Sequence, residues 1–350
     1  MHFHTISDGG CRSYIIACPQ SGAAAVIDPA HGQIERTAGL LAREGLSLRY
    51  IVETHTHADH FTAARMLRQR FGAPMVMHRF AGAGDVDMRI DDGHQLVLGE
   101  LRLKALHTPG HTRDSMCILA GDRVMTGDTL LIGGTGRTDL PTGDADALYD
   151  SLFGKLLALP GETRVYPAHD YKDRDFSTIE EECANNPRLQ RRERQDFVAM
   201  MRSLDLAMPT HLTEALRTNI SGGMTVRQLL AEAAAATPFM AMDELARKLE
   251  ARPNDFIVLD VRERDAWERG RIPGASHLAR GQLELKVDGR FPDPDVEILT
   301  VCEFGKVSIL AAATLRSLGF RRAIALDGGM KAWREAGYPL EDGSDPALMI

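Results

Sequence analysis

The chain has 350 residues, of which 44% are hydrophobic and 26% are charged, and its formal net charge is -8. This length predicts two domains, each large enough to bury a core, and the composition is that of an ordinary globular protein. The acidic balance argues against non-specific binding of nucleic acid, because such binding needs a basic surface that displaces counterions.

Cysteine use and the chain start favour a cytoplasmic protein without a membrane partner. No apolar run approaches the ~20 residues of a membrane span. The first residues, Met-His-Phe-His, lack the basic start and the long apolar stretch of a secretory signal. The five cysteines are too few and too scattered for a disulfide scaffold, so a reducing compartment is expected. They are Cys11, Cys18, Cys117, Cys183 and Cys302.

Short β-rich runs and turn signals alternate through the first domain, which we place at residues 1–220. After a cluster of histidines, apolar residues recur at helical spacing from Phe61 to Phe71, and Gly72 ends this helix. A second helix is expected at residues 188–206. The expected strands are 13–17, 24–27, 49–52, 74–77, 95–98, 101–106 and 164–166.

A linker region is expected at residues 221–238. Turn-forming residues begin it, and Thr225 then opens an Ala-rich helix with Gln228 three positions on, which is a capping-box pattern. The second domain, at residues 239–341, changes to an α/β pattern in which strands and helices alternate. Such strand, helix, strand order predicts a right-handed parallel crossover. Its expected helices are 243–250 and 308–318, and its expected strands are 256–259, 297–301 and 323–326.

The most informative segment is residues 55–60, His-Thr-His-Ala-Asp-His, which follows an apolar run. Buried imidazoles and carboxylates are costly unless they are paired or bound to a metal. His111, Asp128 and His169 also follow strands, at turns that contain Gly or Pro, and loops at one edge of a sheet are where sites assemble. These residues predict a metal centre. The set of candidate ligands fits two zinc ions, and it also fits one iron ion held by two histidines and one carboxylate.

The pattern of these histidines and aspartates resembles the metallo-β-lactamase superfamily, which implies an α/β fold with a four-layer αββα sandwich. Asp28, in Val-Ile-Asp-Pro, matches a supporting carboxylate of that superfamily. The segment Gly127 to Asp139 looks like the persulfide dioxygenase branch, whereas glyoxalase II is similar only as far as Gly136-Arg137. Tyr166-Pro-Ala-His-Asp-Tyr and Asn186-Pro-Arg-Leu also look like persulfide dioxygenases.

That resemblance implies one Fe(II) per chain, with zinc as the alternative, and a small thiol persulfide such as glutathione persulfide as the substrate with O₂. The implied iron ligands are His55, His111 and Asp128. The groups implied to surround them, or to hold an alternative metal, are His57, Asp59, His60 and His169. The candidates for holding the thiol are Tyr171, Arg188 and, more weakly, Arg137. In one departure, residues 209–216 read Pro-Thr-His-Leu-Thr-Glu-Ala-Leu where the family is usually apolar and Pro-rich.

A second constellation surrounds Cys302, which directly follows an expected strand and precedes a short loop and a helix. A thiol in this position faces unpaired backbone N–H groups and the positive end of the helix, which stabilise a thiolate or an anion. The segments 259–262, 270–275 and 326–333 resemble the rhodanese domain. The resemblance makes Cys302 the nucleophile that accepts sulfane sulfur, within a loop formed by Glu303, Phe304, Gly305, Lys306, Val307 and Ser308.

One position of this loop departs from the rhodanese pattern, because Val307 stands where Arg is common. We expect Lys306 to supply positive charge for thiosulfate instead. Since both domains then act on sulfane sulfur, the sequence predicts a bifunctional enzyme that oxidises a persulfide to sulfite and thiol and transfers sulfur between thiosulfate and thiol. The alternatives are a glyoxalase II-like zinc thioester hydrolase fused to a sulfurtransferase, and a sulfur carrier or sensor. The direction of transfer stays open, as does a homodimer.

Overall fold

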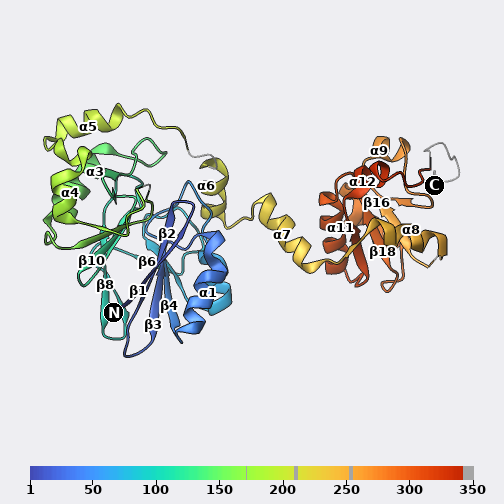
Figure 1. Ribbon diagram of the computed structural model, residues 1–350, viewed down its shortest axis with the longest axis horizontal. Coiled ribbons are helices and arrows are strands. Elements are labelled where there is room, and N and C mark those ends of the chain that lie inside the picture. The colour runs from blue at the N-terminus through green and yellow to red at the C-terminus, as the bar shows by residue number, and fades with distance from the viewer. Residues whose placement is uncertain (171, 209–211, 252–254, 342–350) are drawn as a thin grey trace. The chain divides into compact units, whose positions relative to one another are not determined.

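The computed structural model describes residues 1–170, 172–208, 212–251 and 255–341. The chain forms two compact units, Met1–Gly223 and Met224–Ile350, and each is described by itself (Figure 1). Among the described residues, no helix has both the length and the apolar character needed to cross a bilayer.

Two six-stranded sheets form the centre of the first unit, and a short hairpin accompanies them. The first sheet has the order β1-β2-β3-β4-β5-β6, with β1 (His2–Asp8), β2 (Cys11–Ala17), β3 (Ala23–Ile27), β4 (Ser47–Val52), β5 (Met75–His78) and β6 (Met88–Ile90). The second has the order β14-β13-β10-β9-β8-β7, with β7 (Gln95–Leu98), β8 (Leu101–His107), β9 (Met116–Ala120), β10 (Arg123–Gly127), β13 (Arg164–Pro167) and β14 (Ser177–Thr178). The hairpin pairs β11 (Leu130–Leu131) with β12 (Gly134–Thr135).

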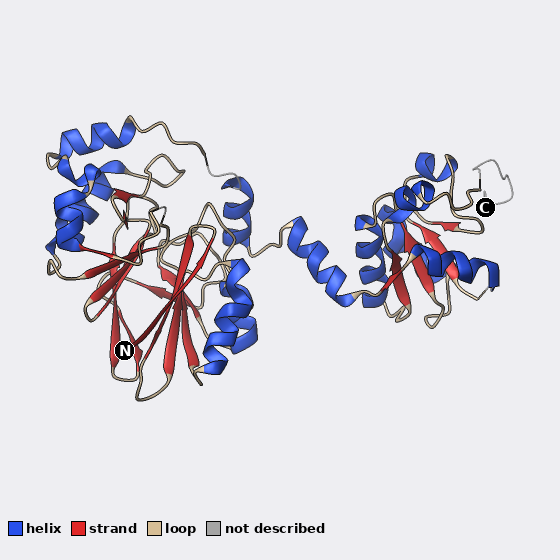
Figure 2. Ribbon diagram, viewed as in Figure 1, coloured by secondary structure: helices blue, strands red, loops and turns tan. Residues whose placement is uncertain are grey.

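Alternation along the strands divides the core of this unit into layers. On β2, Ile15 packs with the helices of the first sheet, whereas Ile16 packs against Ile118 of the second sheet. Helices cover the outer face of each sheet, as Figure 2 shows. The predicted αββα sandwich is therefore confirmed. The helices are α1 (Ile34–Arg43) and α2 (Ala64–Phe71) on the first sheet, and α3 (Ala145–Gly154), α4 (Ile179–Asn185) and α5 (Arg194–Arg202) on the second. Short 3₁₀ helices lie at His31–Gln33, Leu156–Ala158 and Pro187–Gln190.

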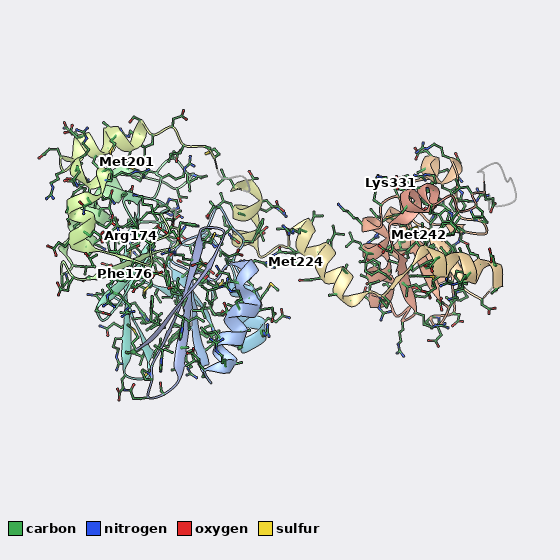
Figure 3. All side chains as sticks on the ribbon, viewed as in Figure 1. Arg174, Phe176, Met201, Met224, Met242 and Lys331 are labelled. Atoms are coloured by element: carbon green, nitrogen blue, oxygen red, sulfur yellow. The ribbon has the colours of Figure 1, made fainter. Side chains whose placement is uncertain are left out.

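Helix α5 differs from the sequence prediction. Instead of one helix over 188–206, the chain forms a 3₁₀ turn at Pro187–Gln190 and then α5 at Arg194–Arg202, on which Figure 3 labels Met201. The Asn186 side chain accepts a hydrogen bond from the Arg188 N–H and so caps a separate short turn. Helical spacing alone could not reveal this cap. The last helix of the unit, α6 (Leu212–Ser221), follows α5.

The second unit is built on a five-stranded sheet of order β15-β19-β18-β16-β17, in which every pair of neighbours is parallel, as predicted. Its strands are β15 (Phe239–Met240), β16 (Ile257–Asp260), β17 (Ser276–His277), β18 (Ile298–Val301) and β19 (Ala323–Leu326). One face packs against α7 (Val226–Ala236), α10 (Leu283–Arg290) and α11 (Lys306–Ser317). The other packs against α8 (Met242–Ala251), α9 (Arg264–Glu268) and α12 (Gly329–Glu335). A 3₁₀ turn lies at Arg280–Gln282.

Helix α7 lies within the expected linker region and begins with the predicted capping box. The Thr225 hydroxyl accepts from the Gln228 N–H, and the Gln228 side chain accepts from the Thr225 N–H. Ala233 of this helix is buried in the cluster that includes Ile309 of α11. The helix therefore packs as part of the second unit.

Candidate metal centre and sulfur-transfer loop

Three predicted ligands from separate parts of the first unit come together. His55 lies in the loop of residues 53–63 between β4 and α2, His111 lies between β8 and β9, and Asp128 directly follows β10. Their ligand atoms lie within 4.8 Å of one another. The Asp128 Oδ2 is 3.6 Å from the His111 Nε2 and 4.0 Å from the His55 Nε2. We call these residues the ligand triad.

Hydrogen bonds fix the orientation of both imidazoles. The Thr54 hydroxyl donates to Asp28, so it accepts from the Nδ1–H of His55, 3.0 Å away. The His111 Nδ1 lies 2.9 Å from the Arg137 carbonyl oxygen, which can only accept. In both rings the proton is therefore on Nδ1, and Nε2 is left with a lone pair.

The protonation states of the ligand triad suit a divalent metal. Burial lowers the pKa of His55 well below its ordinary value, and His57 adds to this effect. Burial alone would raise the pKa of Asp128, but the charge and hydrogen bond of His169 hold it below its usual range. The His55 Nε2 is buried and has no hydrogen-bond partner among the described residues. The neutral His55 imidazole and the Asp128 carboxylate therefore fit a metal ion.

Asp59, His60 and His169 lie beside the ligand triad and contact each other, and with Cys11 they form a second group whose ligand atoms lie within 4.8 Å of one another. His169 lies between two carboxylates, with its Nδ1 2.7 Å from the Asp128 Oδ1 and its Nε2 2.6 Å from the Asp59 Oδ2. The other oxygen of Asp59 is 3.3 Å from the His60 Nδ1. Since both ring nitrogens of His169 face carboxylates, this side chain orients Asp128.

A different pair of acids contacts one nitrogen of His57, whose ring centroid lies 4.1 Å from that of His55. The His57 Nε2 lies 3.2 Å from the Asp28 Oδ1 and 3.1 Å from the Glu53 Oε2, and all three side chains are buried. Burial alone would lower the pKa of His57, but these carboxylates raise it well above its ordinary value. An imidazole that keeps its proton is a poor metal ligand.

The sequence patterns did not single out Cys11 or Glu53. Cys11 has its Sγ 3.6 Å from the His169 Nε2, and the two residues form a backbone bridge. Burial raises the pKa of Cys11, but hydrogen bonds from His169 and His60 lower it to about 6. Cys11 is far from the motif along the chain, so no spacing signal could place it there. Glu53 lies four positions before His57, which is the one local hint.

A cavity of about 490 Å³ opens beside the ligand triad and is lined by Asp128, Ile132 and Arg188, among others. The Arg188 guanidinium donates to the Thr135 carbonyl at 2.7 Å and to its hydroxyl at 3.0 Å. It forms no ion pair with the described residues, and burial lowers its pKa. Arg188 thus offers an uncompensated positive charge to an anionic ligand.

Arg137 lines the same cavity but is already engaged. Its guanidinium contacts both oxygens of Asp139 at 2.6 Å and donates to the carbonyls of Leu206 and Ala207. It therefore holds the cavity wall together. Tyr171, the third predicted thiol-binding residue, lies outside the described residues.

In the second unit, Cys302 directly follows β18, as predicted, and is buried. The Ser308 N–H, in the first turn of α11, donates to the Cys302 Sγ at 3.2 Å, and the Ser308 hydroxyl lies 3.5 Å away. The thiol therefore sits at the positive end of a helix. We call residues 302–308 the sulfur-transfer loop. Its Phe304 and Val307 side chains are exposed.

Contacts with Arg262, which follows β16, and with α12 fix the sulfur-transfer loop. The Glu303 carboxylate pairs with Arg334 and lies 3.4 Å from the Arg262 guanidinium. The Glu303 carbonyl accepts from the N–H of Lys331, which Figure 3 labels on α12. Gly329 has a φ of 64°, and a Cβ there would lie 2.4 Å from the Cys302 carbonyl oxygen. Only glycine allows this close approach.

Family models match both units. A model of the metallo-beta-lactamase superfamily matches residues 6–169, and a model of the rhodanese-like domain matches residues 241–336. The chain is similar to "Persulfide dioxygenase ETHE1, mitochondrial" of Bos taurus, with 39% identity over 215 residues that make up 61% of this chain and 84% of that protein.

Two solved structures are also similar. The crystal structure of ETHE1 from Myxococcus xanthus matches with 40% identity and a TM-score of 0.62, and the match covers 64% of this chain and 100% of that chain. A metallo-beta-lactamase from Staphylococcus aureus subsp. aureus COL shares the fold over 93% of this chain and 97% of its own, with 22% identity and a TM-score of 0.60.

Proposed function

The chain belongs to the ETHE1-like family of the metallo-beta-lactamase superfamily and continues into a rhodanese-like domain, and from this premise we propose that it is a persulfide dioxygenase with sulfurtransferase activity. The first unit oxidises the outer sulfur of a small organic persulfide, such as glutathione persulfide. One persulfide, one O₂ and one water give one thiol, one sulfite and two protons.

The observation that carries the dioxygenase assignment is the pairing pattern around the ligand triad. The ligand atoms of His55, His111 and Asp128 lie within 4.8 Å of one another, whereas the Nε2 of His57 and both ring nitrogens of His169 face carboxylates. Two histidines and one carboxylate are the donor set of non-haem Fe(II) oxygenases. A ferrous ion bound there would supply open coordination positions and a redox-active centre for the oxidation of the persulfide sulfur by O₂. We propose one Fe(II) per chain.

The residues of the cavity bind and orient the persulfide. Arg188 holds a carboxylate of the thiol, while apolar side chains such as Leu131 and Ile132 limit the access of water. Asp128 is kept in place by the His169 Nδ1–H, which donates to its Oδ1. Holding the reacting groups at fixed positions lowers the entropic part of the barrier.

In the second unit, we propose that the Cys302 thiolate attacks the outer sulfur of thiosulfate. A sulfur–sulfur bond forms to Cys302, the bond within thiosulfate breaks, and sulfite leaves with the electron pair. A small thiolate then attacks the outer sulfur of the Cys302 persulfide, which restores Cys302 and yields the organic persulfide for the first unit. The Ser308 N–H near the Sγ stabilises the thiolate.

The dioxygenase assignment is tested with anaerobically iron-loaded protein, glutathione persulfide and an oxygen electrode. His55→Ala removes one donor of the triad, so we expect persulfide-dependent O₂ uptake to fall at least about 100-fold, in line with the loss of a metal ligand. His94→Ala, an exposed histidine outside the site, is the control and should retain the rate.

Two results would contradict the proposal. Full O₂ uptake by His55→Ala would remove the catalytic role of the triad and favour a sulfur carrier. Two zinc ions per active chain, with thioester hydrolysis and no O₂ uptake, would favour a hydrolase of the glyoxalase II kind.

A further inference from the structure

The loop of residues 53–63 carries much of the metal centre without being part of a sheet or helix. Its backbone groups must therefore find partners elsewhere. Two of its carbonyls, those of His57 and His60, flank the segment that contains Asp59. Both accept hydrogen bonds from the side-chain Nδ2 of Asn219, at 2.8 and 2.9 Å. The Thr62 N–H donates to the Oδ1 of the same amide at 3.1 Å. Asn219 is itself buried.

Asn219 belongs to α6, which lies outside the segment that the superfamily model matches. The end of this helix is anchored independently of the Asn219 side chain. Arg65 of α2 donates to the carbonyls of Thr218 and Asn219 and forms a two-fold ion pair with Asp85, at 2.7 Å for each bond. A substitution of the Asn219 side chain should therefore leave α6 docked.

Contacts lead from Asn219 to the ligand triad. The held segment contains Asp59, whose Oδ2 lies 2.6 Å from the His169 Nε2. The other nitrogen of His169 lies 2.7 Å from Asp128, one of the proposed metal ligands. If the loop loosens, Asp59 no longer fixes His169, and His169 no longer fixes Asp128.

We propose that Asn219 is a positioning residue for the metal centre: its side-chain amide fixes residues 57–62 and thereby the orientation of Asp128. This inference rests on the proposed function of the ligand triad. The side-chain amide of Asn219 replaces backbone partners that the loop lacks. Its NH₂ group donates to two carbonyls, and its oxygen accepts from one N–H. The first unit is then complete only with α6.

Asn219→Ala and Asn219→Asp test this role in the full-length chain. The alanine leaves three backbone groups, one buried and two partly buried, without their partner, and the aspartate, which has the same shape, places a carboxylate oxygen against two carbonyls. Thr218→Val is the matched control, because the buried Thr218 hydroxyl has no hydrogen-bond partner among the described residues. The three variants and the unsubstituted chain are compared by thermal melting to establish that they fold.

Three readouts apply. For both Asn219 variants we expect faster amide hydrogen exchange in residues 57–62 of the metal-free protein and a roughly tenfold weaker affinity for Fe(II) in anaerobic chelator competition, the lower end of the effect of outer-sphere partners. We also expect a lower kcat with an unchanged KM for glutathione persulfide, because Asn219 does not line the substrate cavity. Thr218→Val should match the unsubstituted chain in all three.

Wild-type exchange and wild-type Fe(II) affinity in folded Asn219→Asp would overturn the inference, as would equal losses in Thr218→Val. Exchange and affinity are measured without persulfide and O₂. A chain that binds Fe(II) in this Asn219-dependent way but consumes no O₂ would therefore refute the dioxygenase activity and not the positioning role.

Discussion

Arg188 and Arg137 line one cavity, yet their surroundings give them different tasks. Arg137 forms an ion pair with Asp139 and donates hydrogen bonds to the carbonyls of Leu206 and Ala207 in the cavity wall. Among the described residues, the Arg188 guanidinium donates only to neutral oxygens of Thr135. A partly buried guanidinium without an anion is costly to keep and is well suited to bind a carboxylate. We therefore propose that Arg188 recognises the substrate.

Replacement of Arg188 by Ala should raise the KM for glutathione persulfide about 10- to 100-fold with little change in kcat. The reason is the loss of one charge-assisted hydrogen bond, worth about 1.5–3 kcal/mol. Steady-state O₂ uptake measures both constants. Arg192→Ala, an exposed arginine nearby in sequence, is the control. A fall in kcat at constant KM would show that Arg188 does not act in binding.

The sequence identified the residues that one local motif or one strand end could reveal. His55, His111 and Asp128 each follow a strand at a turn, so their convergence was predictable. The expectation of a single sheet edge was wrong, because His55 follows β4 of the first sheet, whereas the other two follow β8 and β10 of the second. Asn219, Cys11 and Glu53 were not predictable, because no pattern in the sequence shows which distant loop an amide or thiol will reach. Their roles depend on tertiary packing alone.

The element formed by β18, the sulfur-transfer loop and α11 depends on a close approach from α12. The N–H of Met330 donates to the Cys302 carbonyl at 2.8 Å, and Gly329 brings the two backbones together. The loop is thus shaped by a second helix as well as by its own sequence.

Gly329→Ala should abolish this approach, because its Cβ would overlap the Cys302 carbonyl and its φ of 64° disfavours a side chain. We expect thiosulfate:thiol sulfurtransferase activity to fall at least about 100-fold, by the loss of a catalytic geometry that tolerates only small displacements. Persulfide-dependent O₂ uptake should be unchanged. Gly289→Ala on α10 has open space around it and serves as the control. Normal sulfur transfer by Gly329→Ala would show that the loop tolerates displacement.

Element boundaries were predictable where a local signal sets them. Gly72 ends α2 in the left-handed conformation, and Thr225 opens α7 with its capping box, both as the sequence indicated. The continuous helix expected at 188–206 was wrong, because the Asn186 cap starts a separate turn whose Arg188 reaches Thr135. The hydrogen bond from Arg188 to Thr135 favours the short turn over a continuous helix, and helical periodicity in the sequence does not show this contact.

Considered as a whole, the chain joins two units whose proposed chemistries share one compound. Each unit has its own buried core and carries one of the two proposed centres. Organic persulfide is the product of the second unit in one direction and the substrate of the first. The proposed coupling is therefore chemical and can work through free persulfide.

Cys302→Ser should separate the two activities. With preformed glutathione persulfide, O₂ uptake should match that of the unsubstituted chain. With thiosulfate and glutathione as the only sulfur sources, O₂ uptake should fall to background, because no persulfide is then formed. Cys183→Ser, a partly buried cysteine outside both centres, is the control. Sustained O₂ uptake from thiosulfate by Cys302→Ser would refute the sulfur-transfer role of Cys302.

The contacts of His169 with the carboxylates of Asp59 and Asp128 also have a consequence for the number of metal ions that the site would bind. A second metal ion that binds His169 and Asp59 would first have to break their ion pair. It would also remove the contact between His169 and Asp128. Asp59 and His169 lie within ligand distance of Cys11 and His60, so these four side chains form a second candidate metal group. Because of the ion pair, we expect this group to take up a metal ion less readily than the ligand triad does.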